Sequence, residues 1–472
     1  MTVLADAEPR VTTQTVRPEP VEGLPASWAR VPIQDIAAIN PRVPKPESDA
    51  DSLVHFVPMS AVVEEFGGIN VSTLRPLREV QKGYTSFVGN DVLFAKITPC
   101  MENGKAALVP HLSNTIGFGS TEFHVLRGER GIDPRWLAQF VSQAEFRRLA
   151  RQNMAGSAGQ MRVPTNWLSV TGIPLAPAAE QTRIVEKLEE LLSDLDAGVA
   201  ELKAAQKKLT QYRQSLLKAA VEGALTTNGL FATSQLGTLV TSIGQGWSPK
   251  CEGTSSDDDN IWAVMKTTAI QPLAFDGSHN KVLPSDLAPR RHLELVEGDL
   301  LITRAGPRNR VGITCLVKKV KERLILCDKA YRLRVDESRI LPAFLELVLN
   351  APHMTAAIDV IKTGINDSGL NLTQDRFFSL AIPLPSISDQ RKLIEILELA
   401  KADIDRKESA IALALKQSTA QRKNILKAAF SGKLVPQDPN DEPASVLLTR
   451  IRAERSATVV SQTGGKRRKI VA

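Results

Sequence analysis

The chain is short of the residues from which catalytic centres, metal sites and membrane spans are usually built. Of its 472 residues, four are cysteine, six are histidine and 5% are aromatic. The cysteines form no CxxC pair and have no zinc-type spacing with histidine, so we expect reduced structural thiols. No run approaches the ~20 apolar residues of a membrane span, and the first residues lack the apolar core of a signal peptide. These absences predict a cytoplasmic protein without a membrane partner.

Motifs for catalysis are also missing. There is no GxxxxGK[ST] phosphate loop, and there is no Asn-Pro-Pro-Tyr-like tetrapeptide of the kind that adenine methyltransferases use to hold a flipped base. The histidines are scattered and suggest no triad. The run Asp257-Asp258-Asp259 could bind a cation, but a solvated loop is the more common role of such a run. We therefore expect a non-catalytic chain that holds no cofactor and no metal of its own.

What the sequence does contain is an internal repeat. The tripeptide Ile-Pro-Leu at 173–175 recurs at 382–384, an offset of 382 − 173 = 209, and the same offset relates Gln181 to Gln390. It also relates the stretch 217–225 to 426–434, while 91–96 matches 299–304 at an offset of 208. Two copies of one unit imply a pseudo-twofold axis, which suits a partner that is itself roughly twofold. Double-stranded DNA is such a partner.

The composition of the chain is compatible with DNA binding, but it does not establish it. The chain is 43% apolar and 24% charged, which is typical of a globular protein, and its length predicts more than one domain. Its net charge is +7 and its pI is about 9.2. A basic balance is compatible with a polyanionic partner, although many basic proteins never bind nucleic acid.

Two proline-free stretches predict long helices. The first, 179–222, carries an apolar heptad, and the second, 388–431, repeats it with a weaker seam that includes Lys407, Ser418 and Gln421. Neither stripe can be buried alone, so we expect the two helices to pair as an antiparallel coiled coil; the alternative is that each docks on an unrelated surface. The first seam is predicted at Ile184, Leu188, Leu191, Leu195, Leu202, Leu209, Tyr212 and Leu216.

The predicted fold class is α+β, with two tandem mixed α/β domains that are each followed by one long helix. Short β-rich runs at 86–97, 105–109 and 122–126 precede a helical stretch at 134–152, and 299–303, 312–317, 331–335 and 342–349 repeat that order. The predicted segments are a flexible arm (1–26), a first α/β domain (27–178), a first helix (179–228), a second α/β domain (229–387), a second helix (388–435) and a tail (436–472) with a short helix at 444–455.

The motifs together resemble the specificity (S) subunit of Type I restriction–modification systems over nearly the whole chain. The resemblance is carried by 91–105, 117–123 and 156–160, by 173–181 with its echo at 382–390, and by 217–225 with its echo at 426–434. It implies that each α/β domain reads one half of a bipartite DNA target and that the helices set the spacer. It also implies two methyltransferase (M) subunits that use S-adenosylmethionine, and restriction (R) subunits that use ATP and Mg²⁺. Those cofactors would belong to the partners.

Residues that read bases should offer paired donors or acceptors. Arg and Lys suit guanine, Asn and Gln suit adenine, and further cations fix the register on phosphates. The second copy departs from the family wording of 98–105 and has Ala305–Gly312 there, so base contacts cannot be transferred between the copies. The expected DNA-binding residues are Lys96, Asn103, Lys105, Gln160 and Arg162 in the first domain, and Arg304, Arg308, Asn309, Arg310, Asn366 and Asn371 in the second.

Two other functions stay open from the sequence. A duplicated scaffold could bind proteins rather than DNA, and salt-sensitive, sequence-specific duplex binding would separate the two. A nuclease or methyltransferase acting by itself is the third possibility, and the missing motifs oppose it.

Overall fold

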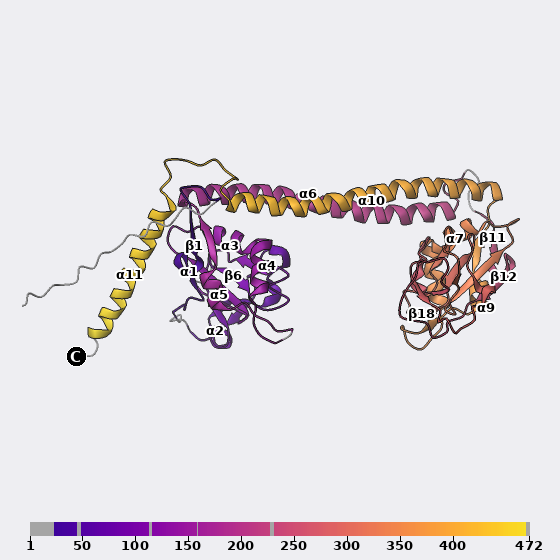
Figure 1. Ribbon diagram of the computed structural model, residues 1–472, viewed down its shortest axis with the longest axis horizontal. Helices are drawn as coiled ribbons and strands as arrows, with labels where there is room; N and C mark the ends of the chain where they lie inside the picture. Colours follow the sequence, from indigo (N-terminus) through magenta and orange to yellow (C-terminus); the bar gives the residue numbers. More distant parts are fainter. Residues whose placement is uncertain (1–22, 45–48, 113–115, 158, 227–230, 469–472) are drawn as a thin grey trace, which may run out of the picture. The chain divides into compact units, whose positions relative to one another are not determined.

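The structure, a computed structural model, describes residues 23–44, 49–112, 116–157, 159–226 and 231–468. Most of the predicted flexible arm therefore lies outside the described residues. The chain divides into two compact units. The first unit joins Met1–Ala200 to Leu415–Ala472, and the second unit is Glu201–Ala414. Each unit thus contains one α/β domain and part of each long helix (Figure 1).

The first unit is built on two four-stranded sheets. The central sheet has the order β2-β9-β6-β7 and is antiparallel throughout. Its strand β6 is buried at every position, as expected for an apolar run that is covered on both faces. The strands are β2 (Ala37–Ile39), β9 (Phe123–Gly128), β6 (Val92–Ala95) and β7 (Ala106–Leu108), and the second sheet has β4 (Leu74–Pro76), β3 (Leu53–Val57), β8 (Gly117–Gly119) and β5 (Thr85–Phe87).

The stretch predicted at 134–152 is helical, but it is broken into two helices at Gln143. Gln143 has an extended backbone (φ −64°, ψ 136°) that ends α3 (Pro134–Ser142) and begins α4 (Ala144–Gln152). The break turns α4 so that Phe146 packs on Phe140 and Phe94, with ring centroids 5.2 and 5.4 Å away. Aromatic burial in the core outweighs helix continuity here.

The unit also has β1 (Ala29–Pro32), α1 (Ile33–Ile36), α2 (Leu77–Val80), α5 (Thr165–Val170) and β10 (Gly172–Leu175).

The second unit repeats the central sheet with the order β12-β21-β17-β19. Strand β17 follows β6 at the repeat offset and is likewise fully buried. The sheet consists of β12 (Val240–Gln245), β21 (Ala330–Val335), β17 (Leu300–Thr303) and β19 (Thr314–Leu316), beside β16 (Asn280–Val282), β13 (Ala263–Met265) and β20 (Leu324–Ile325). The remaining elements are β11 (Thr233–Gln235), β14 (Ile270–Gln271), β15 (Ala274–Phe275), β18 (Ala305–Gly306), α7 (Pro342–Asn350), α8 (Pro352–Ile361), β22 (Leu370–Asn371), α9 (Gln374–Phe378) and β23 (Ala381–Pro383).

The two long helices are α6 (Ala178–Val221) and α10 (Ile387–Phe430), each of 44 residues. In the first unit the start of α6 and the end of α10 share one hydrophobic core with the α/β domain. In the second unit the end of α6 and the start of α10 do the same. The helices therefore run antiparallel within each unit, and the predicted α+β fold with paired helices is confirmed.

The seam between the helices differs in detail from the predicted heptad. Ile184 and Leu188 are buried as expected, but the prediction for Tyr212 was wrong, because 55% of this residue is exposed. Arg213 takes the seam position instead, and its guanidinium lies 2.7 Å from Asp405 and 3.3 Å from Glu408 on α10. A long aliphatic stem lets arginine cover a seam while its charged end reaches solvent.

A second interhelical ion pair, in the first unit, joins Arg422 of α10 to Asp196 of α6. It is the repeat-related copy of the Arg213–Asp405 pair, because 213 + 209 = 422 and 196 + 209 = 405. In both units an arginine near the end of one helix meets an aspartate of the other. The duplication has therefore preserved the contact as well as the fold.

Two buried glutamines fasten the first turn of each long helix to its domain. The Gln181 side chain accepts a hydrogen bond from the Asp133 amide (3.0 Å) and donates one to the Ala176 carbonyl (2.9 Å). Gln390, its repeat partner, accepts from the Leu341 amide (2.8 Å). It also donates to two carbonyls, those of Arg339 (2.9 Å) and Pro385 (3.0 Å). Every partner in these five hydrogen bonds is a main-chain atom.

The final helix, α11, spans Ala444–Arg468 and is longer than the predicted 444–455. Its first turns are buried through Leu447, Leu448 and Ile451 in the core of the first unit.

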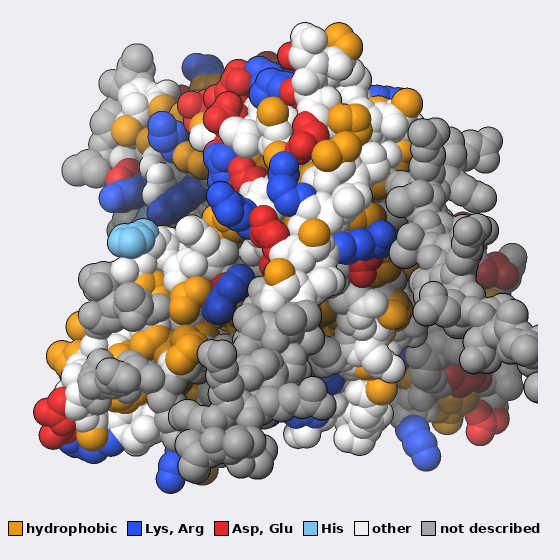
Figure 2. Space-filling view, turned by 90° about the vertical axis from the view of Figure 1, so that its left-hand side faces the viewer, with side chains coloured by type: hydrophobic (Ala, Val, Ile, Leu, Met, Phe, Trp, Pro, Cys, Tyr) orange, Lys and Arg blue, Asp and Glu red, His pale blue; other side chains and the backbone are white. Residues whose placement is uncertain are grey.

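Figure 2 shows basic, acidic and hydrophobic side chains interspersed over one face of the described residues, rather than separated by kind. The domain boundaries predicted along the chain stay predictions.

No single helix among the described residues is long and apolar enough to cross a membrane. The bent pair α7 and α8, with 76° between its helices, meets that test by length and composition. Phe344, Leu345, Val348 and Leu349 of α7 are buried in the core of the second unit.

Candidate nucleic-acid interface

In each unit a loop after the inner strand of the central sheet is hydrogen-bonded to a segment before a short helix. In the first unit the Val163 amide donates to the Lys96 carbonyl (2.8 Å), and in the second the Leu372 amide donates to the Arg304 carbonyl (2.7 Å). These bonds are repeat-related, since 163 + 209 = 372 and 96 + 208 = 304. We call 96–105 with 155–163 the first loop pair, and 304–312 with 363–372 the second loop pair. All eleven predicted DNA-binding residues lie on them.

In the first loop pair, three predicted residues bind the protein itself. Arg162 holds Glu122 through two hydrogen bonds of 2.9 and 2.8 Å, which keep the pKa of Glu122 below its usual value. Asn103 donates to Glu64 (3.0 Å) and Lys105 donates to the Met59 carbonyl (3.3 Å). Bonds of this kind position the loop, but they leave fewer donors for DNA.

The other two residues of the first loop pair differ from these three. Gln160 is exposed, and Lys96 is half-buried. Within the described part of the chain, neither side chain has a hydrogen-bond or ion-pair partner at contact distance. An amide and an ammonium in that state can both reach an outside ligand.

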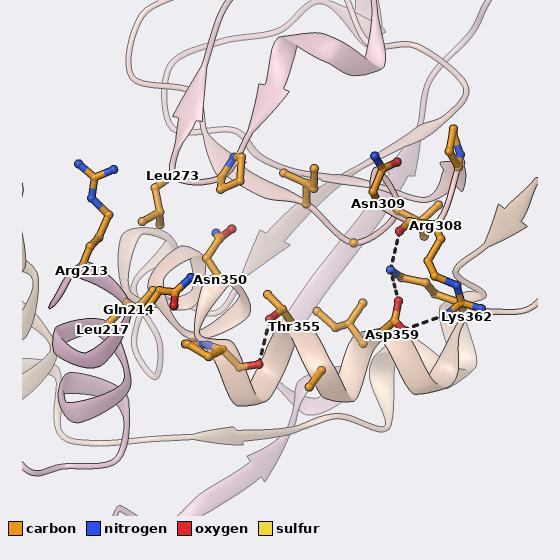
Figure 3. A pocket seen from close by; sticks show the side chains of 18 of the residues that line it. Arg213, Gln214, Leu217, Leu273, Arg308, Asn309, Asn350, Thr355, Asp359 and Lys362 are labelled. Atoms are coloured by element: carbon orange, nitrogen blue, oxygen red, sulfur yellow. Dashed lines mark hydrogen bonds and ion pairs between the residues drawn. The ribbon is translucent and has the colours of Figure 1, made fainter. Parts of the chain in front are cut away.

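In the second loop pair, all three arginines are engaged. Arg308 lies 2.9 Å from Asp359 and 3.0 Å from Asp367, as the close-up in Figure 3 shows for Asp359. Arg310 donates to the carbonyls of Thr267 (2.6 Å) and Ile270 (2.7 Å), and burial lowers the pKa of Arg310. Arg304 donates to the Asp328 carbonyl (2.8 Å). These side chains tie the loop to the domain.

Three asparagines are the exposed amides of the second loop pair. Asn309 lines a cleft of about 930 Å³ beside Arg308, and Asn366 lies in the exposed turn 364–369. Asn371 is in β22, which pairs with Ala305 of β18. An exposed amide carries a donor and an acceptor side by side, which is what bidentate contact with adenine requires.

Comparisons with known proteins bear on the family of the chain. No family model matches the chain. The specificity subunit of the Type I restriction enzyme EcoEI of Escherichia coli is 29% identical over 463 residues, covering 79% of this chain and 78% of the relative. That of EcoKI of E. coli K12 is 26% identical over 401 residues, covering 79% and 83%. The crystal structure of the HsdS subunit from Thermoanaerobacter tengcongensis aligns with a TM-score of 0.55 at 23% identity, covering 87% and 98%. The chain belongs to the Type I restriction enzyme specificity subunits.

The acidic run of this specificity subunit accepts hydrogen bonds from main-chain amides, one in its own loop and one at residue 322. Asp258 accepts a hydrogen bond from the Asn260 amide (2.8 Å), and Asp259 accepts one from the Glu322 amide (3.1 Å). Across the described residues no group of three or more His, Cys, Asp or Glu side chains is arranged to hold a metal ion. Carboxylates satisfied by amide donors stabilise a turn, as expected of a loop.

The four cysteines are free thiols. Cys315 and Cys327 are buried in the second unit, and burial raises the pKa of the Cys327 thiol to about 11. Burial also raises the pKa of Cys315. A buried thiol that stays protonated behaves as a small apolar side chain and not as a nucleophile.

Replacement of Arg310 by alanine is expected to weaken specific DNA binding by about 1–3 kcal/mol. The structure gives the loss an indirect cause, because Arg310 fixes the short helical turn 267–269 and the start of β14 against the second loop pair through two carbonyls. Binding to a duplex that carries the target would measure the change. Unchanged affinity and an unchanged target sequence would contradict the assignment.

Proposed function

We propose that this specificity subunit is the sequence reader of a Type I restriction–modification complex, with each recognition domain reading one half of a bipartite DNA target. The observation that carries the proposal is the repeat relation of the two loop pairs. One main-chain frame is present twice, and it displays Lys96 and Gln160 in one unit but Asn309 and Asn366 in the other. One fold with two sets of polar side chains is what two different half-sites require.

The partners follow from the duplication. Two copies of one helix–domain joint offer two equivalent docking surfaces, so two methyltransferase subunits are expected. In this proposal S-adenosylmethionine is bound by those subunits, ATP and Mg²⁺ belong to restriction subunits, and this chain acts without a cofactor of its own. The cytoplasmic location predicted from the sequence fits a DNA-directed role.

Long-read mapping of adenine methylation tests this function directly. Hosts carrying the chain with its methyltransferase partner would be compared with hosts lacking only this chain. A bipartite motif that disappears with the chain is the expected result, and it gives both half-sites at once. Methylation that persists unchanged would contradict the proposal and favour a protein-binding scaffold.

The helix pair is proposed to set the spacer, and its two repeat-related ion pairs provide a test. Reversing Arg213 and Arg422 to aspartate places like charges across the seam at both contacts. Loss of each ion pair lowers the free energy of unfolding by at most about 1 kcal/mol. The fold should therefore survive, while the pairing of the two helices loosens. We expect the mapped motif to tolerate spacers one base pair longer or shorter.

Restoring complementary charge should restore the strict spacer. The rescue variant adds Asp196→Arg and Asp405→Arg to the two reversals. The control is Arg406→Asp, because Arg406 pairs with Asp403 of the same helix and makes no interhelical ion pair among the described residues. A spacer that stays strict in the double reversal would show that these contacts do not govern the spacing.

A further inference from the structure

The second unit carries a group of aromatic and basic side chains outside the loop pairs. The Arg290 guanidinium lies over the Trp247 ring at 4.4 Å from its centroid, and that of Arg291 lies over the Trp262 ring at 6.0 Å. Arg290, Arg291 and the nearby Lys250 are exposed, and the two tryptophans are half-buried. We call Trp247, Lys250, Arg290 and Arg291 the tryptophan–arginine surface.

These cations differ from the arginines of the second loop pair. Arg304, Arg308 and Arg310 each donate at least one side-chain hydrogen bond to a protein oxygen. By contrast, no side-chain hydrogen bond or ion pair joins Lys250, Arg290 or Arg291 to any other described residue. Positive charge that the fold leaves uncompensated is what a polyanion can neutralise, with release of counterions.

The main chain holds Trp247 firmly in place. Its amide donates to the Leu326 carbonyl (2.9 Å). A side chain at the preceding Gly246 would lie 2.2 Å from that same oxygen, so the close approach requires glycine. A guanidinium stacked on a fixed ring is oriented in advance, while its N–H edges remain available for a bidentate contact with phosphate.

The tryptophan–arginine surface is also linked to the second loop pair. The Asp328 amide donates to the Ser248 hydroxyl (3.1 Å), and the Asp328 carbonyl accepts from Arg304 (2.8 Å). Residues 246–248 and the loop that begins at Arg304 are therefore held by one short segment, 326–328. A duplex lying along the second loop pair would have the stacked arginines within the same binding face.

We propose that the tryptophan–arginine surface binds the phosphate backbone of the DNA duplex and fixes the register of the second recognition domain on it. This inference rests on the proposed function, since it names the backbone contacts of the same interface. Its ligand is duplex DNA, recognised through phosphate oxygens and not through bases. Such contacts position a protein on DNA without carrying sequence information.

The test is the salt dependence of duplex binding by the full chain with its methyltransferase partner. One phosphate contact contributes about 0.9 to the slope of log K against log salt concentration. Arg290→Ala is therefore expected to lower the slope by about one and to weaken affinity about fivefold at 0.15 M salt. The loss should be equal on the target duplex and on an unrelated duplex. Arg290→Lys keeps the charge without the planar stack, so it should keep the slope and lose part of the affinity.

The control is Lys208→Ala, which removes an exposed cation of α6 that also has no side-chain partner among the described residues. It should leave slope and affinity unchanged. Arg290→Ala with the parental slope and affinity would overturn the inference, and a loss confined to the target duplex would also overturn it, because that would indicate base reading. Failure of the parental complex to prefer its target would instead contradict the proposed function.

Discussion

Phe430→Ala is expected to lower the free energy of unfolding of the first unit by about 3–5 kcal/mol. Phe430 is the last residue of α10 and only 6% exposed. Its ring centroid lies 4.2 Å from that of Trp136 and 5.6 Å from that of Phe140, both on α3. Removing the ring leaves a cavity where the helix meets the domain, and aromatic packing is lost together with buried area. Urea unfolding of the purified full chain would measure the change.

Leu413→Ala on the same helix is the matched control. Its side chain is 57% exposed, so truncation should change the free energy of unfolding by no more than about 0.5 kcal/mol. A Phe430→Ala variant as stable as this control would show that the end of α10 is not anchored by the aromatic cluster.

Gln390→Leu is the second substitution for which we expect a large effect. It removes the acceptor of the Leu341 amide and the donor shared by the carbonyls of Arg339 and Pro385. The glutamine is fully buried, and each buried polar group left unsatisfied costs about 1–3 kcal/mol. We expect lower stability in the second unit, and faster hydrogen exchange at the Leu341 amide than at amides in the central sheet.

The control for this variant is Gln421→Leu, an exposed glutamine of the same helix. It changes the same atoms without opening a buried joint, so its stability should stay within about 0.5 kcal/mol of the parent. Exchange at Leu341 that is equally slow in both variants would argue against a role for Gln390 at the joint.

The helices could be predicted almost to the residue, whereas most side-chain partners could not. A proline-free heptad identifies a long helix because its signal is periodic and local, and α6 and α10 begin and end within one residue of the prediction. The break at Gln143 and the exposure of Tyr212 were missed, because tertiary packing decides both.

In the candidate site, too, the main-chain arrangement could be predicted from the sequence, whereas the side-chain partners could not. The repeat offset indicated that Lys96 and Arg304 are equivalent, and the main-chain hydrogen bonds agree. No local pattern indicated that Arg162 would contact Glu122, 40 residues away, or that Arg290 would stack on Trp247. Such pairs form only when the fold brings distant loops together, and whether a cation is free or engaged depends on them.

The glutamine joints explain how the two copies could diverge so widely. Gln181 and Gln390 form these hydrogen bonds only with main-chain amides and carbonyls. Those atoms stay in the same place when side chains change, provided that the backbone path is kept. These hydrogen bonds therefore do not depend on which side chains the domain carries, unlike the hydrophobic contacts that also join helix and domain. Substitutions on the loops of a domain can therefore change what it recognises while these hydrogen bonds to the long helix are kept.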